Sequence, residues 1–121
     1  LNRDIVLKME LCEENPSVKM DTSLFEQVLI NVIKNSAESI EETGHILIRT
    51  SAEPLMLEVS DDGKGIAKEV EIKLFSPFFS TKPNGQGIGL IFIREVLMKH
   101  GCTFSLRTYE DGITRFRICF P

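Results

Sequence analysis

The chain has 121 residues, of which 42% are hydrophobic and 26% charged. This balance is typical of a globular domain and excludes a disordered, collagen-like or membrane-spanning chain. The net charge of −4 gives no overall positive field, which argues against a nucleic-acid partner or an anionic membrane surface. We expect one domain, residues 1–121, that holds any anionic ligand by local geometry. Because it begins at Leu1 without a leader, we expect it to be a piece of a longer protein.

Three cysteines, Cys12, Cys102 and Cys119, lie far apart in the sequence. Their odd number and the absence of a C-x-x-C pair argue against a disulfide framework or a zinc site. The sequence therefore predicts buried free thiols.

The first predicted element is a strand at residues 4–11. Apolar and polar side chains alternate there, with Ile5, Leu7, Met9 and Leu11 on one face. Such alternation is typical of a half-buried strand.

A long amphipathic helix is expected to follow, from about Leu24 to Ile40. Ser23 and Glu26 fit a capping box, and Asp21 is an alternative cap. Gly44 is predicted to end the helix.

The rest of the chain predicts further strands and one more long helix. The expected elements are strands at 46–52 and 55–60, a short helical piece near 68–75, a helix at 88–100, and a hairpin of 103–108 and 113–120. This order predicts an α+β sandwich, in which a mixed sheet carries helices on one face.

Asn31, Asn35 and Ser39 follow one line along the first long helix, with about 40° between successive members. Carboxamides near buried surface need hydrogen-bond partners. They either bond to a neighbouring loop or line a polar slot beneath it. In such a slot, a neutral amide oxygen can help to hold Mg²⁺ when substrate phosphates supply most of the charge.

A first glycine loop, Asp61-x-Gly63-x-Gly65, directly follows a predicted strand. Its glycines allow positive φ and close approach of a ligand to the backbone. An acidic side chain entering such a turn can accept a hydrogen bond from an exocyclic amine. The pattern alone is also typical of an ordinary turn.

A second glycine loop, Gly85-x-Gly87-x-Gly89, opens the second long helix. Unpaired amides and the helix dipole make such a place a natural phosphate site. Its spacing fits neither the dinucleotide pattern nor the P-loop. Lys82 is the cation beside this loop. The segment between the two glycine loops contains Phe75, Phe78 and Phe79, which indicates packing residues within a closing flap.

Taken together, these motifs resemble the catalytic ATP-binding domain of bacterial sensor histidine kinases. The matching stretches are Asn31-x-x-x-Asn35, Asp61-x-Gly63-x-Gly65, Phe75-x-x-Phe78-Phe79 and Gly85-x-Gly87-x-Gly89-Leu90. The resemblance runs from about Asp4 to Pro121, and the short flap ending in Ser80-Thr81-Lys82-Pro83 is similar to the nitrogen-regulatory and sporulation kinases. It implies a two-layer α/β sandwich of the Bergerat type, with a mixed, mostly antiparallel sheet and ATP bound between the helices.

The resemblance also implies roles for single residues. Asp61 would bond the adenine amine, and Asn35 would ligate Mg²⁺ with Asn31 supporting the triphosphate. The remaining nucleotide contacts would come from the glycine loops, the flap and the final hairpin, at Gly63, Gly65, Ile66, Thr81, Lys82, Gly85, Gly87, Ile88, Gly89, Leu90 and Thr114. A family lysine is replaced by Glu38, which shifts phosphate binding toward Lys82.

By resemblance, the domain binds Mg-ATP and donates its γ-phosphoryl group to a histidine, with Asn31, Asn35 and Lys82 as catalytic residues. His45 and His100 lie in no phosphoacceptor motif, so both are predicted to be structural. The expected partners are an absent dimerisation and phosphoacceptor domain and a response regulator. The full-length protein would be a homodimer. This domain would be cytoplasmic and make no membrane contact, and membrane anchoring of the full-length protein is left open.

Three other functions remain open from the sequence. A gyrase-like or mismatch-repair-like ATPase clamp would carry a general-base glutamate where this chain has Asn31, and asparagine is a poor base. A relative of the anti-sigma serine kinases would phosphorylate a protein serine. A pure docking module would have lost its affinity for ATP.

Overall fold

The structure, a computed structural model, describes residues 3–76 and 88–121. Its elements are β1 (Asp4–Glu10), α1 (Thr22–Glu38), β2 (Thr43–Ala52), β3 (Leu55–Asp61), α2 (Lys68–Glu71), α3 (Ile88–Lys99), β4 (Thr103–Thr108) and β5 (Thr114–Cys119). Five strands form one sheet in the order β1-β2-β3-β5-β4. Only β1 and β2 run parallel, whereas the other pairs are antiparallel.

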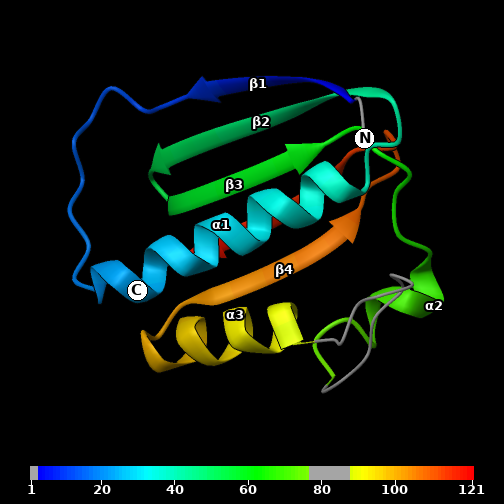
Figure 1. Cartoon of the computed structure of the whole chain (residues 1–121). Coiled ribbons are helices and arrows are strands. Elements are labelled where there is room, and N and C mark those ends of the chain that lie inside the picture. Colours follow the sequence, from blue (N-terminus) through cyan, green and yellow to red (C-terminus); the bar gives the residue numbers. More distant parts are fainter. Residues whose placement is uncertain (1–2, 77–87) are drawn as a thin grey trace.

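Helices α1 and α3 lie side by side on one face of this sheet (Figure 1). The predicted α+β sandwich, with a mixed and mostly antiparallel sheet, is therefore confirmed. The core lies between the two layers and is formed mainly by β-branched and leucine side chains. Its buried members are Val28, Val32, Ile40, Ile46, Val59, Ile93, Val96, Leu97, Cys102, Phe116 and Ile118.

Helix α1 begins one residue after Asp21, whose carboxylate Oδ1 accepts a hydrogen bond from the Leu24 backbone N–H at 3.0 Å. The alternative cap is thus the correct one, and Ser23 lies within the first turn. An aspartate in this position satisfies one of the donors that a helix start leaves unpaired.

The predicted end of the helix at Gly44 is wrong, because α1 ends at Glu38 with Ser39 as its C-cap. Leaving the helix there allows Ile40 to enter the core, where it is 1% exposed. Gly44 lies in β2 instead and pairs with Ile5. A Cβ at Gly44 would lie 2.9 Å from Ile40 Cγ2, so close packing, not helix termination, explains the glycine.

The strand β1 is more exposed than its alternating pattern predicts. Its Leu7 and Met9 are 55% and 62% exposed, and Leu11 just beyond is 60% exposed. The reason is position: β1 is the edge strand, and α1 contacts β2 and β3. In Figure 1, β1 lies along the upper edge of the sheet, beyond the helix layer.

Other element boundaries differ by a few residues from the expected ones. Strand β2 already begins at Thr43, where it pairs with Asp4, and β3 extends to Asp61. The short helical piece α2 ends at Glu71 and is continued by turns.

All three cysteines lie in the described residues and are free thiols, as predicted. Cys102 alone is fully buried, whereas Cys12 and Cys119 are partly buried. Burial raises the pKa of the Cys102 thiol.

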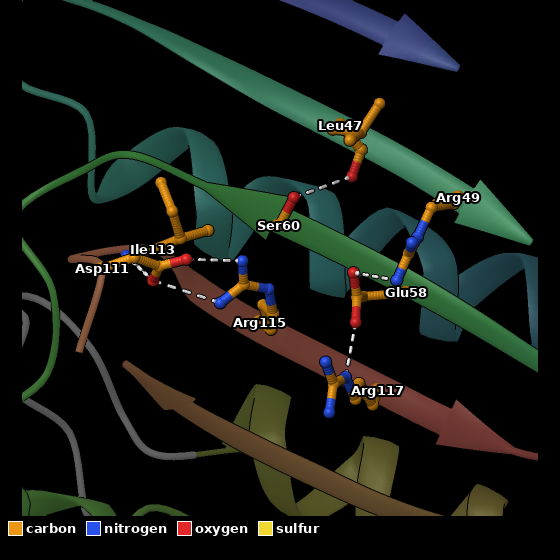
Figure 2. Close-up of polar contacts among 8 residues, drawn as sticks. All are labelled: Leu47, Arg49, Glu58, Ser60, Asp111, Ile113, Arg115 and Arg117. Carbon is orange, nitrogen blue, oxygen red and sulfur yellow. Dashed lines mark hydrogen bonds and ion pairs between the residues drawn. The ribbon is translucent and has the colours of Figure 1, made fainter. Parts of the chain in front are cut away.

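The face of the sheet opposite the helices is polar and carries its own charge pairs (Figure 2). Glu58 is 3% exposed there and pairs with Arg49 and Arg117 from the two neighbouring strands. Arg115 pairs with Asp111 at 2.8 Å. These charges therefore neutralise one another on the outer face. A site for a charged ligand is expected instead on the inner face or its rim.

Candidate nucleotide-binding site

The described residues predicted to bind a nucleotide converge at one end of the sandwich. Strand β3 ends there at Asp61, beside the C-terminal end of α1 and next to Thr114, its pairing partner on β5. In Figure 1 this is the end on the right, toward which α1 and β3 both run. Residues from distant parts of the chain therefore meet because β3 and α1 end where β5 begins.

Asp61 is the most firmly held polar residue of this site. The residue is 5% exposed, and its Oδ1 accepts hydrogen bonds from the Ser39 hydroxyl at 2.8 Å and the Gly63 backbone N–H at 2.9 Å. Within the described part of the chain, no donor is bonded to its Oδ2. One carboxylate oxygen is thus fixed, and the other can accept from a ligand.

Gly63 approaches the end of α1 more closely than any side chain would permit. A Cβ at this position would lie 2.1 Å from Ser39 Oγ and 2.6 Å from the Ser39 carbonyl oxygen. That carbonyl also accepts a hydrogen bond from the Lys64 N–H at 3.0 Å. The first glycine loop is therefore docked directly on the C-cap of the helix.

The far side of this loop is held by threonines of the final hairpin. Gly65 has φ +79°, and the following Ile66 donates its backbone N–H to Thr108 Oγ1 at 2.8 Å. Thr108 Oγ1 lies 2.7 Å from Thr114 Oγ1, so the Thr114 hydroxyl belongs to this network. Glu71 joins it by accepting the Thr108 N–H at 3.0 Å.

Sequence reasoning missed Thr108. The signal that could have found it is its register, because Thr108 pairs directly with Thr114 across β4 and β5. Cross-strand threonines are known to bond through their hydroxyls.

Asn31 and Asn35 lie half-buried on α1. Asn31 donates its amide to the Gln27 carbonyl of its own helix at 2.8 Å. A Cβ added to Gly89 would lie 3.6 Å from Asn31 Oδ1. The start of α3 therefore lies beside this face of α1, as a phosphate site between the two helices requires.

Four predicted phosphate-binding residues, Thr81, Lys82, Gly85 and Gly87, lie outside the described residues, as do Phe78 and Phe79. Of the rest of the second glycine loop, Ile88 begins α3, and Gly89 and Leu90 lie in its first turn. Leu90 packs against the core.

Phe75, at the start of the predicted flap, packs edge-on against Phe104 and Phe116, with ring centroids 5.2 and 6.1 Å away. Its predicted packing role is confirmed. Edge-to-face contacts of this kind stabilise an aromatic core beyond simple burial.

Asp62, the neighbour of Asp61, points to a different partner. Its Oδ1 accepts the His45 backbone N–H, and its Oδ2 lies 2.7 Å from His45 Nδ1. The hydrogen bond from this backbone N–H lowers the pKa of Asp62. Asp62 also lines an open depression of about 290 Å³ with Glu41 and Glu42, and so many carboxylates make it unsuitable for a triphosphate.

His100 is held by two backbone groups. Its Nε2 accepts the Asp21 N–H at 3.1 Å, and its Nδ1 lies 2.8 Å from the Val96 carbonyl oxygen, to which it donates. The ring thus joins the start of α1 to the end of α3. These contacts, and the pairing of His45 with Asp62, agree with structural roles for both histidines.

A family model described as "Histidine kinase-, DNA gyrase B-, and HSP90-like ATPase" matches residues 20–121. Among solved structures, the catalytic domain of the histidine kinase ThkA superposes with a TM-score of 0.86 at 31% identity, covering 97% of this chain and 80% of that one. The chain belongs to this family, as the ATP-binding catalytic domain of a histidine kinase.

The catalytic domain also has full-length relatives among the sensor kinases. The sensor histidine kinase ZraS of Escherichia coli O157:H7 is 31% identical over 121 residues, which are 98% of this chain and 26% of ZraS. The sensory histidine kinase/phosphatase NtrB of Rhodobacter capsulatus is 31% identical over 121 residues, covering 88% of this chain and 34% of NtrB. The chain thus spans about a quarter to a third of these relatives.

No helix among residues 3–76 and 88–121 is long and apolar enough to cross a membrane.

Proposed function

We propose that this domain binds ATP together with Mg²⁺ and donates the γ-phosphoryl group to a histidine on a separate dimerisation domain of its parent protein. The observation that carries the proposal is the geometry of Asp61. Its Oδ1 is held by the Ser39 hydroxyl and the Gly63 N–H, so its Oδ2 is available to accept from the exocyclic amine of adenine.

The surroundings of Asp61 suit a purine ring. Gly65 and Ile66 form one wall, and Thr108 fixes that wall through the Ile66 backbone N–H. Thr114 lies next to Asp61 across the strand pair. Backbone and short side chains leave space here for a flat ligand.

The triphosphate would extend from adenine toward the first turn of α3. There, Asn31 faces Gly89 across the gap between the helices, and the helix dipole favours negative charge. We assign the phosphate contacts to Thr81, Lys82 and the backbone amides around Gly87 and Gly89 on the strength of their place in the sequence. Gly85, Ile88 and Leu90 are assigned on the same ground to the wider nucleotide site. Phosphoryl transfer depends mainly on positioning and charge neutralisation, which Asn31 and Lys82 would supply.

The donor set fits a magnesium ion that arrives with its nucleotide. Among the described residues, no group of three His, Cys, Asp or Glu side chains could hold a metal ion. A carboxamide oxygen from Asn35 is a suitable single protein ligand when phosphates and water complete the shell. The ion would neutralise phosphate charge during transfer.

We place the phosphoacceptor histidine, the dimer contacts and the docking of a response regulator in parts of the parent protein outside this chain, and this domain in the cytoplasm. Sensor kinases such as ZraS, which are about four times as long, motivate this assignment. It also agrees with the contacts of His45 and His100, which bind other parts of this domain.

The test is the substitution Asn35→Ala in the full-length protein, with autophosphorylation from labelled ATP as the readout. We expect the phosphohistidine signal to be lost. The matched control is Lys34→Ala, a change at the exposed neighbouring position of the same helix, which should retain the signal. Undiminished labelling of Asn35→Ala would overturn the proposal. Sustained release of ADP without phosphohistidine would favour an ATP-hydrolysing clamp instead.

A further inference from the structure

Ser39 lies where helix α1 meets the first glycine loop. It is the C-cap of α1, and its hydroxyl oxygen lies 2.8 Å from both Asp61 Oδ1 and the Ser36 carbonyl oxygen. A hydroxyl has one proton to donate, and an ionised carboxylate can only accept. Donation to Asp61 is therefore favoured, because a charge-assisted hydrogen bond is stronger than one to a neutral carbonyl.

The backbone of Ser39 fixes the same loop a second time. Its carbonyl oxygen accepts the Lys64 N–H at 3.0 Å, and Gly63 packs against it so closely that a Cβ would lie 2.6 Å from this oxygen. Gly63 in turn donates its N–H to Asp61 Oδ1. Ser39, Asp61 and Gly63 thus form a closed triangle of contacts.

This triangle determines which way the Asp61 carboxylate faces. Two donors converge on Oδ1, so rotation of the carboxylate would break both hydrogen bonds. Removing the Ser39 hydroxyl would leave the Gly63 N–H as the single donor on Oδ1. The carboxylate could then turn, and Oδ2 would spend less time in the direction of a ligand.

We propose that Ser39 is a positioning residue for purine recognition: its hydroxyl holds Asp61 Oδ1 so that Oδ2 is presented to the amino group of adenine. Ser39 acts through Asp61 and sets the preference for a base that carries this amino group. The inference rests on the proposed role of Asp61 in adenine binding.

Ser60 offers a matched control. It is the residue immediately before Asp61 and is 7% exposed, so it is a buried serine of the strand that carries Asp61. Its hydroxyl lies 3.5 Å from the Leu47 carbonyl oxygen, on the face of the sheet opposite α1 (Figure 2). Ser60→Ala therefore removes a buried hydroxyl without removing a contact to Asp61.

The experiment measures the dissociation constants of the 121-residue chain for ATP and for purine riboside triphosphate, which lacks the exocyclic amine. We expect Ser39→Ala to weaken ATP binding about fivefold, the usual worth of one hydrogen bond. It should leave the affinity for the purine analogue unchanged. Ser60→Ala should change neither affinity. Ser39→Gly also removes the hydroxyl, and glycine suits a helix C-terminus, so it serves as a second variant if Ser39→Ala does not fold.

If Ser39 had only a structural role, Ser39→Ala would lower the affinity for both nucleotides equally, and that result would overturn the inference. Equal losses for Ser39→Ala in the wild-type and Asp61→Ala backgrounds would overturn it as well, because a residue that acts through Asp61 must show coupling with it. If the unsubstituted chain binds ATP no better than the purine analogue, the proposed role of Asp61 itself fails. The two failures are therefore distinguishable.

Discussion

Two glycines of the first glycine loop are needed for different reasons. At position 63 a side chain would clash with the nearby Ser39, whereas Gly65 is needed because its backbone has a positive φ of +79°. A left-handed backbone costs an ordinary residue about 1–2 kcal/mol, and a steric clash with fixed backbone costs about 1–3 kcal/mol. A sequence pattern of D-x-G-x-G cannot separate these causes, but substitutions can.

We expect Gly63→Ala to lower the free energy of unfolding by about 1–3 kcal/mol and to weaken ATP binding by at least ~10-fold. The reason is that its Cβ would force the loop away from Ser39 and thereby displace Asp61. Gly101→Ala is the control, since Gly101 has φ +74° with only ordinary contact distances around it and follows the C-terminal end of α3 at Lys99. It should cost about 1 kcal/mol without affecting ATP binding. Urea unfolding and calorimetry provide the two measurements, and equal ATP affinities for both variants would contradict this account.

The candidate site could be predicted in part from its residues. The first glycine loop predicts Asp61, Gly63 and Gly65, the family resemblance adds Thr114, and the structure brings all four together. Thr108 carries no motif, and the sequence places Ser39 only on a polar line with Asn31 and Asn35. Each is fixed by a contact between elements far apart in the sequence, Ser39 with Asp61 and Thr108 with Ile66. Such contacts depend on strand register and on where a helix ends, which local patterns do not encode.

Among the secondary structure elements, α1 poses a clear question of capping. The sequence permits Asp21 or Ser23, and the structure places the Leu24 N–H on the Asp21 carboxylate at 3.0 Å. We expect Asp21→Ala to reduce the free energy of unfolding by about 1 kcal/mol, the usual worth of an N-cap. Ser23→Ala, at an exposed position within the helix, should change it by less than about 0.5 kcal/mol. Urea unfolding of both variants checks this, and the opposite order of effects would restore the capping box at Ser23.

The two elements that sequence patterns predicted least well fail for the same reason. Gly44 is a residue type that often ends a helix, but it lies in a strand against Ile40. Leu7 belongs to an alternating pattern typical of a half-buried strand, but its side chain is exposed. In both cases the outcome depends on which neighbour packs there. Periodicity identifies the type of an element, whereas its neighbours determine its ends and its burial.

At the scale of the whole molecule, the sheet order separates residues that are adjacent in sequence. Strand β5 inserts between β3 and β4, which brings Arg117 next to Glu58 on the outer face and Thr114 next to Asp61 on the inner rim. Alternation along β5 thus directs its basic side chains away from the candidate nucleotide site. An acidic domain can therefore place its arginines in structural pairs and rely on local geometry for phosphate.

Two aspartates that are hydrogen-bonded to a basic residue, Asp62 and Asp111, also make the stability of the fold depend on pH. Hydrogen bonds from His45 and from Arg115 lower the pKa values of Asp62 and Asp111 below the ordinary 3.8. In acid, the unfolded chain therefore binds more protons than the folded one. Stability then rises with pH through this window. The contribution is fully present above about pH 5 and is lost as the pH falls through the folded pKa values.

We expect the difference in free energy of unfolding between the wild type and Asp62→Asn to be larger at pH 6 than at pH 3, and the same for Asp111→Asn. Asparagine keeps the shape and one acceptor oxygen but cannot titrate, so the change isolates the charge. Comparing variants at equal pH cancels the titration of all other groups. The two effects should add in the double variant, because Asp62 and Asp111 share no partner among residues 3–76 and 88–121. Urea unfolding at both pH values measures these differences. A difference that stays constant or widens on acidification would show that the charges of these carboxylates contribute nothing to the folded state.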